Sequence, residues 1–185
     1  MRHPCSNPPA SRYRRAGIGC IAAAGLALTA TPAAAGTVEL VVVQPLDFGA
    51  MVVLGAARKQ ITPDGRITAS GLAAVPGARE GAAEFILRYR PDSPGRSALL
   101  LVTLATASPL TVNGSTGTLT GLATDLPGLL GLTNGQSRTL RLTPCAALLC
   151  ETRIRVGGTL TLSGGSTAAS FSFPLQVTAR LLAEL

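Results

Sequence analysis

Tryptophan is absent from this chain, and histidine and aromatic side chains are scarce. The 185 residues include one histidine, His3, together with two tyrosines and four phenylalanines. Ser-His-Asp and Cys-His arrangements need a histidine, and His3 lies in a segment that we expect to be removed. The motifs Gly-x-Ser-x-Gly, Gly-x-x-x-x-Gly-Lys and Asp-x-Asp-x-Asp-Gly are also missing. We therefore expect no catalytic residue, no cofactor and no metal site, and a protein that is not an enzyme.

The first 35 residues have the pattern of a secretory signal peptide. Gly17–Ala30 is an apolar stretch of 14 residues, too short to span a membrane stably. Ala33 and Ala35 place small residues at the −3 and −1 positions of a cleavage site between Ala35 and Gly36. A basic start precedes this stretch and consists of Arg2, Arg12, Arg14 and Arg15. We therefore expect export, to the periplasm, the cell surface or the medium.

Two other targeting signals are less well formed. Arg14-Arg15 is a twin arginine, but Ala16-Gly17 follow where that pathway prefers a bulky apolar pair. Cys20 would be the residue for a lipid anchor, but the usual leucine three positions before it is missing. Cleavage by signal peptidase at Gly36 is the better supported prediction.

The net charge falls once the first 35 residues are set aside. Sixteen basic against nine acidic residues give +7, and without the four leading arginines the balance is twelve against nine, or +3. The remaining arginines are scattered and not interleaved with aromatic residues, so we expect no nucleic-acid partner. No apolar run of membrane-spanning length follows Gly36, so we expect no stable membrane insertion after cleavage.

Residues 36–185 predict one all-β domain. Short segments rich in Val, Leu, Thr and Ile are separated by Gly, Pro, Asn or Asp every 8–15 residues, as in an antiparallel β-sandwich or barrel. Pro63-Asp64-Gly65 predicts a hairpin that pairs Arg58–Thr62 with Arg66–Ser70. Alternation predicts Phe85 and Leu87 on the inner face of one strand, and a single strand over Ser170–Leu182 closes the domain. We expect a single antiparallel β-sandwich, Ig-like or pilin-like in type.

The first predicted strand of this domain lies directly after the cleavage site. In Val38–Val43, Val38, Leu40 and Val42 alternate and are expected to form one apolar face. Such a segment completes its own sheet or is donated to a neighbouring subunit. We favour pairing within its own domain, since only Gln44-Pro45 separate it from the next segment.

That next segment, Leu46-Asp47-Phe48-Gly49, resembles the opening signature of a bacterial secreted family known only as domain of unknown function 4402. Further matches follow in order and cover nearly all of residues 36–185: Pro63-Asp64-Gly65, Ala83–Leu87, Val156–Leu160 and Ser170–Arg180. One departure is Ala179-Arg180-Leu181, where the family's final strand commonly ends near a tyrosine. The resemblance implies an extracytoplasmic β-sandwich, somewhat like pilin and spore-coat-type domains, and no known activity.

Cys145 and Cys150 are expected to form a structural disulfide. Cys5 and Cys20 lie before the cleavage site, so these two have no other partner in an oxidising compartment. Four intervening residues allow the chain to turn back far enough for the bond. A redox-active pair would more typically be Cys-x-x-Cys, and a zinc site would need two more ligands.

Asp47 has two interpretations. It is either a ligand or catalytic carboxylate, or a turn or bulge residue that caps backbone N–H groups beside Gly49. The second is favoured because no other acidic residue lies nearby in the sequence.

These observations favour a non-enzymatic structural protein of the bacterial envelope or surface, with a fimbria-like subunit as its specific form. Its partners would be copies of itself or other envelope proteins. The alternative is a monomeric secreted module that binds carbohydrate or protein, and exposed Tyr89 or phenylalanine side chains on a concave patch would favour it. Two carboxylates facing each other in a cleft would instead favour an enzyme.

Overall fold

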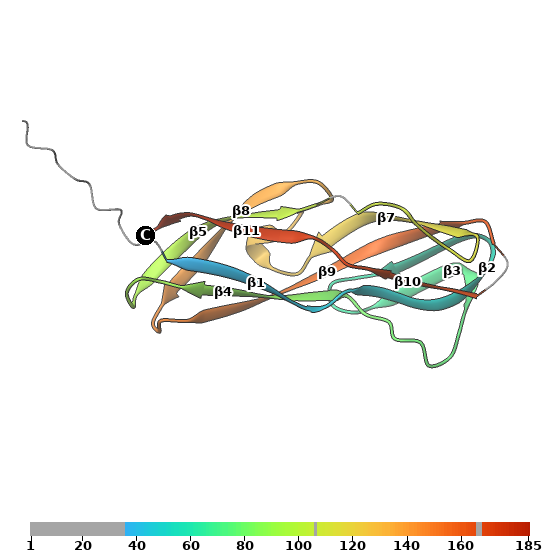
Figure 1. The fold of residues 1–185 in the computed structure, drawn as a ribbon, viewed down its shortest axis with the longest axis horizontal. Helices are drawn as coiled ribbons and strands as arrows, with labels where there is room; N and C mark the ends of the chain where they lie inside the picture. The colour runs from blue at the N-terminus through green and yellow to red at the C-terminus, as the bar shows by residue number, and fades with distance from the viewer. Residues whose placement is uncertain (1–35, 106, 166–167) are drawn as a thin grey trace, which may run out of the picture. The chain divides into compact units, whose positions relative to one another are not determined.

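The computed structural model describes residues 36–105, 107–165 and 168–185, which form two packed antiparallel sheets (Figure 1). The expectation of a single antiparallel β-sandwich is confirmed. The expected signal peptide, including Ala35 of the cleavage site, lies outside the described residues.

The larger sheet contains eight strands, with β1-β4-β9-β2-β10 as its main path. Strand β3 pairs with β2, and β7 pairs with β9 and β6, so the sheet branches at β2 and β9. The bounds are β1 Thr37–Gln44, β2 Leu46–Ile61, β3 Ile67–Ala74, β4 Ala83–Arg90, β6 Leu110–Val112, β7 Ser115–Thr124, β9 Cys150–Ser163 and β10 Ala168–Phe173.

The smaller sheet has the order β11-β5-β8, with β5 Arg96–Leu104, β8 Ser137–Cys145 and β11 Val177–Glu184. A single 3₁₀ turn, η1 Pro127–Leu129, lies in the connection between β7 and β8. The two sheets bury apolar residues of every long central strand between them, so the core follows from the period-two alternation of those strands.

Two local predictions are confirmed by the register. Arg58 pairs with Ser70 and Ile61 with Ile67 across the predicted hairpin, and the Thr62 amide donates to the Arg66 carbonyl at 2.9 Å. Gly65 has φ +84°, a value that glycine adopts without strain. In β4, Phe85 and Leu87 are buried, whereas Glu84, Ile86 and Arg88 are only partly buried, as the alternation predicts.

The expectation of one closing strand over Ser170–Leu182 is wrong. The segment divides into β10 and β11, which belong to different sheets. Pro174, which follows β10 directly, has no N–H to donate to a ladder, and the chain crosses from one sheet to the other at this point. Period-two burial continues through Phe171, Phe173 and Leu175, which explains why the sequence pattern suggested one continuous strand.

The expected apolar face of β1 is only partly correct. The strand pairs with β4 of its own domain, from Thr37 opposite Arg90 onward. Val38 and Leu40 pack partly buried against the core, but Val42 is 59% exposed. The register shifts between Val42 and Gln44, and such a bulge interrupts the regular inward alternation at the end of the strand.

Every aromatic residue of the described chain is buried: Phe48, Phe85, Tyr89, Phe171 and Phe173 are each at most 4% exposed. The exposed Tyr89 or phenylalanine patch that would have favoured a binding module is therefore not present in this part of the chain.

Candidate functional site

The Leu46-Asp47-Phe48-Gly49 segment forms a bulge at the start of β2. Opposite it on β10, Phe171 pairs with Gly49 and Ser172 pairs with Asp47, so the ladder passes over Phe48. The Phe48 side chain is fully buried and meets the ring of Phe173 edge to face, with centroids 6.0 Å apart. A bulge of this kind places Phe48 in the core while its carbonyl has no partner in the β10 ladder.

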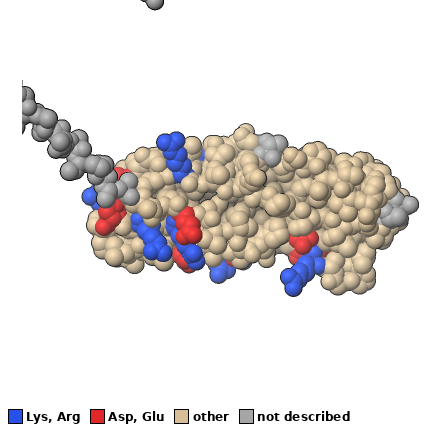
Figure 2. Space-filling model, in the orientation of Figure 1, with Lys and Arg blue, Asp and Glu red and all other residues tan. Residues whose placement is uncertain are grey.

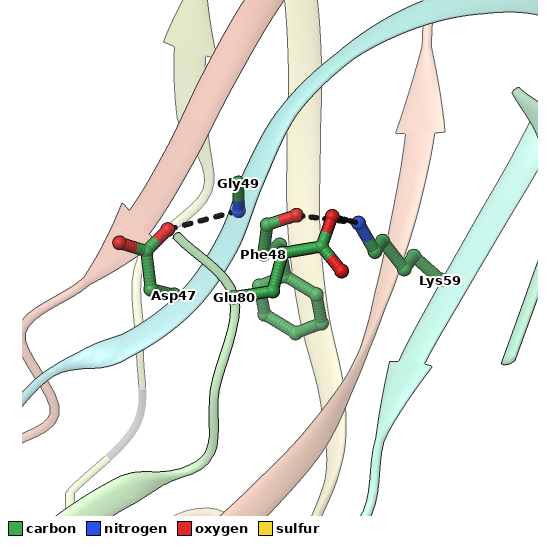
Figure 3. Close-up of polar contacts among 5 residues, drawn as sticks. All are labelled: Asp47, Phe48, Gly49, Lys59 and Glu80. Atoms are coloured by element: carbon green, nitrogen blue, oxygen red, sulfur yellow. Dashed lines mark hydrogen bonds and ion pairs between the residues drawn. The ribbon is translucent and has the colours of Figure 1, made fainter. Parts of the chain in front are cut away.

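Asp47 acts within this bulge as a capping residue. Its Oδ1 accepts a hydrogen bond from the Gly49 amide at 2.9 Å (Figure 3). Its own backbone exchanges hydrogen bonds of 3.0 and 2.8 Å with Gly81. The expectation that Asp47 is a turn or bulge residue is confirmed, because its carboxylate binds the backbone of its own segment.

Gly49 is required by conformation and by space. Its φ is +73°, and a Cβ added there would lie 3.0 Å from the Arg79 carbonyl oxygen and 2.8 Å from Glu80 Cγ. The residue therefore allows the segment before β4 to pack directly against the bulge.

Lys59 completes this site and was not anticipated from the sequence. Its Nζ donates to the Phe48 carbonyl at 2.7 Å and forms an ion pair with Glu80 Oε1 at 2.5 Å (Figure 3). The Lys59 residue is 1% exposed, and the Glu80 side chain is 22% exposed. The ammonium thus joins the free carbonyl of the bulge to the loop before β4, and both partners compensate its burial.

A signal for Lys59 was present in the sequence. It is the only lysine of the chain, and its position between Arg58 and Gln60 places it on the inner face together with Ala57 and Ile61. Alternation alone predicts its burial, but its partners come from residues 11 and 21 positions away, which no local pattern identifies.

The glycines of the matched Val156–Leu160 segment are explained by close packing. A Cβ on Gly157 would lie 2.3 Å from the Ile61 carbonyl oxygen, and one on Gly158 would lie 2.8 Å from Leu122 Cδ2. At this point β9 leaves its ladder with β4, which ends at Val156, and pairs with β2 from Gly158 onward. The two glycines therefore allow β9 to pass closely between β4 and β2 at this point.

Cys145 and Cys150 form the expected disulfide, with their Cα atoms 5.9 Å apart. Cys145 ends β8 and Cys150 begins β9, so this short loop joins the smaller sheet to the larger one covalently. The pairing is confirmed, and the structure adds that the bond links two sheets.

A second group of polar side chains lies at the end of the domain where β1 begins. The Tyr89 hydroxyl donates to Glu184 Oε1 at 2.5 Å, and the side chains of Asp92 and Glu184 share a further hydrogen bond. Burial, followed by the bond to Glu184, raises the pKa of Tyr89. The bond from Tyr89 lowers the pKa of Glu184, whereas the bond to Glu184 raises the pKa of Asp92.

Asp92 and Glu184 are thus two carboxyl groups in contact, the feature that would have favoured an enzyme. Glu184, however, also accepts from the backbone amide of Gly36 and from the Tyr89 hydroxyl. Its oxygens are therefore engaged by donors of the chain itself, which is a structural arrangement.

Within the described ranges, no group of three or more His, Cys, Asp or Glu side chains is placed to hold a metal ion. In the same part of the chain, no helix has the length and apolar character needed to cross a bilayer.

A family model described as "Domain of unknown function (DUF4402)" matches residues 23–180 of the chain. Neither the curated proteins nor the solved structures gave a match.

Proposed function

The chain belongs to the DUF4402 family, and from this premise we propose that it is an exported, non-enzymatic structural protein of the bacterial envelope. The observation that carries the proposal is the disulfide between Cys145 and Cys150, which staples one sheet of the sandwich to the other. Structural disulfides of this kind persist in oxidising compartments outside the cytoplasm. The signal-peptide pattern of residues 1–35 independently favours the same destination.

The charged side chains support a structural role because they bind one another across strands. Arg88 Nε on β4 lies 2.8 Å from Glu151 Oε1 on β9. Between the same two strands, Arg153 Nη1 lies 3.1 Å from Glu84 Oε1. Figure 2 shows that charges on the face in view gather at the end where β1 begins, with a smaller group farther along. The rest of this face carries no charge, which suits contact with neighbouring envelope proteins or with copies of the chain.

A fimbria-like subunit remains the specific form that we propose for this structural role. Strand β1 is an edge strand that pairs with β4 alone, and its outer edge borders β11 of the other sheet. Donation of β1 to a neighbouring subunit would require it to leave this position. Polymerisation that keeps β1 in place would instead use the exposed faces of the sandwich.

Cell fractionation of the native producer, or of a heterologous bacterium carrying the full-length gene, tests the proposal. Thiol alkylation followed by mass spectrometry reports both processing and the cysteines. We expect a chain that begins at Gly36, lies outside the cytoplasm, fractionates with the envelope and has no free thiol. A full-length cytoplasmic chain with both thiols free would overturn the proposal.

A second candidate function, a polysaccharide-binding module, is favoured by the outer face of β7, β9, β2 and β3. Eight residues form two rows in register there, which we call the hydroxyl face: Thr120, Thr159, Gln60 and Thr68 in one row, and Thr118, Thr161, Arg58 and Ser70 in the other. Thr159 is only 5% exposed, so the other seven residues would make the contacts with a ligand. Arg58, Gln60, Thr68 and Ser70 line a shallow hollow on it. Hydroxyl, amide and guanidinium groups in rows can donate to the hydroxyls of an extended sugar chain.

Cosedimentation with insoluble cell-wall polysaccharides distinguishes the two functions. A binding module would be depleted from solution, and Arg58→Ala would reduce the depletion several-fold. Arg180→Ala, an exposed arginine of the other sheet, serves as the matched control. If the wild-type protein stays in solution, the second candidate is excluded and the structural role stands alone.

A further inference from the structure

The first described residue, Gly36, lies against the last residue of β11. The Glu184 carboxylate accepts a hydrogen bond from the Gly36 backbone amide. A Cβ added to Gly36 would lie 2.1 Å from Glu184 Oε1 and 2.7 Å from the Arg90 carbonyl oxygen. Figure 1 shows β1 beginning beside the end of β11, and these two strands are in contact. A residue with a side chain would therefore displace the carboxylate from this amide.

Glu184 is itself held in position. Its neighbour Leu185 exchanges two backbone hydrogen bonds with Ser97, of 3.0 and 2.9 Å. The fully buried Tyr89 donates its hydroxyl to Glu184 Oε1 at 2.5 Å. Both contacts fix the carboxylate toward the backbone nitrogen of Gly36.

We propose that Glu184 is the binding site for the α-ammonium group that cleavage between Ala35 and Gly36 creates. This inference rests on the export proposed above. Hydrolysis adds one water across the peptide bond, so Ala35 leaves with a carboxylate and Gly36 keeps the amine, which takes up a proton. Before cleavage the Gly36 nitrogen is a neutral amide donor to the carboxylate, and after cleavage it carries a full positive charge, so the hydrogen bond becomes an ion pair in which both partners are charged.

Cleavage of the signal peptide would therefore add a stabilising contact at the start of β1. Strand β1 is an edge strand with only partly buried apolar side chains, so few other contacts hold its first residue. An ion pair between Gly36 and Glu184 would join the two edge strands β1 and β11 where they meet. The processed chain would therefore be more stable than the precursor, and its first strand would be harder to detach.

The charged groups around Glu184 set the expected pH dependence. They are Tyr89 from β4, Asp92 from the turn after it, and Arg96 from the start of β5. An α-amine titrates near 8 when free, and pairing with Glu184 raises that value in the folded state. The stabilisation is then fully present below the pKa of the unfolded chain and is lost as the pH rises through the higher folded pKa.

The pKa of the Gly36 α-amine can be measured selectively, because the only other amine of the processed protein is that of the buried Lys59. Reductive methylation of the processed protein with ¹³C-formaldehyde labels the accessible amine and preserves its positive charge. An NMR titration then gives the pKa of the α-amine directly. We expect a value about one unit above that of the same protein in denaturant.

Three variants of the processed protein test whether Glu184 raises the pKa of the α-amine. Glu184→Gln keeps an acceptor for Tyr89 but removes the charge, and it should abolish the rise in pKa. Gly36→Ala should reduce the rise, because the added Cβ displaces the carboxylate. Glu39→Gln, which removes an exposed carboxylate of β1, should leave the pKa unchanged.

The second measurement is thermal unfolding of proteins that begin at Gly36 or at an added Met before it. We expect a higher Tm for the former at pH 7, with the difference vanishing above pH 10 and in the Glu184→Gln background. An α-amine with the same pKa in the folded and unfolded states, or equal Tm values, would overturn the ion pair. N-terminal sequencing of exported material tests the cleavage itself, so failure of export and failure of the ion pair give different results.

Discussion

The ammonium nitrogen of Lys59 lies 2.7 Å from the carbonyl oxygen of Phe48, at the position of β2 that the ladder with β10 skips. The only lysine of the chain therefore compensates the one backbone irregularity of the Leu-Asp-Phe-Gly segment. Its second partner, Glu80, belongs to the loop that packs against Gly49. The buried Lys59 ammonium thus connects its own part of β2 to the bulge at Phe48 and to the loop that carries Glu80.

This ion pair predicts an asymmetry between its two partners. Glu80→Ala leaves a buried ammonium with the Phe48 carbonyl alone and should cost about 3 kcal/mol of unfolding free energy. Lys59→Met removes the charge, leaves Glu80 near solvent and should cost about 1–2 kcal/mol, mainly from the unpaired carbonyl. Urea denaturation of both variants measures the difference. Equal costs, or a larger cost for Lys59→Met, would contradict the assigned roles.

Gly49→Ala should be destabilising for two reasons that can be separated. Its positive φ strains any residue with a Cβ, and the Cβ would also meet Arg79 and Glu80. Gly77 has φ +80° but open space around a Cβ, so Gly77→Ala measures the strain alone, at about 1 kcal/mol. We expect Gly49→Ala to cost at least about 1 kcal/mol more than this control. Similar unfolding free energies for the two variants would show that packing at Gly49 is unimportant.

The disulfide should stabilise the domain without being needed for its fold. Closing a six-residue loop contributes about 2 kcal/mol on the chain-entropy model. Replacement of both Cys145 and Cys150 by alanine should therefore lower the unfolding free energy by about this amount and leave the strand content unchanged. Circular dichroism and urea denaturation measure both quantities. The reduced wild-type protein is the matched control and should behave in the same way.

Asp92→Asn should stabilise the protein near neutral pH. The raised pKa of Asp92 means that its ionised form is disfavoured beside Glu184, whereas an asparagine amide can still donate to that carboxylate. The gain should be present above the folded pKa of Asp92 and disappear as the pH falls below it, because the wild-type side chain is then protonated as well. Thermal unfolding from pH 3 to 8 measures this. A constant difference between the two proteins across that range would contradict the coupling.

The lowered pKa of Glu184 changes the stability with pH in the opposite direction to the raised pKa of Asp92. Its contribution is present above the pKa of the unfolded chain and is lost as the pH falls through the lower folded value. Glu184→Gln should therefore flatten the acid limb of the plot of unfolding free energy against pH, measured by urea denaturation from pH 3 to 7.

Deletion of Gly36–Val43 distinguishes self-pairing of β1 from donation. The structure pairs β1 with β4, so removal should expose the edge of β4 and cause aggregation or a lower Tm. Any assembly of the intact processed protein should then not depend on β1, so size-exclusion chromatography with light scattering should find no polymers that the deletion abolishes. Polymers of the intact protein that the deletion abolishes would identify β1 as a donor strand.

Much of this protein was determined by its sequence alone. Alternation and turn residues were enough for the all-β class, the hairpin at Pro63-Asp64-Gly65 and the inner face of β4, because each depends on neighbours a few positions apart. The disulfide followed from elimination, since Cys145 and Cys150 had no other partner after the predicted cleavage.

Only the tertiary structure decided which strands share a sheet and which polar groups meet. The alternation of Phe171, Phe173 and Leu175 continues across Pro174, so the division into β10 and β11 was hidden by a pattern that records burial but not sheet membership. Lys59 with Phe48, and Tyr89 with Glu184, are brought together by ladders between distant segments. Local chemistry fixes the direction of a side chain, whereas its partner depends on the packing of the whole chain.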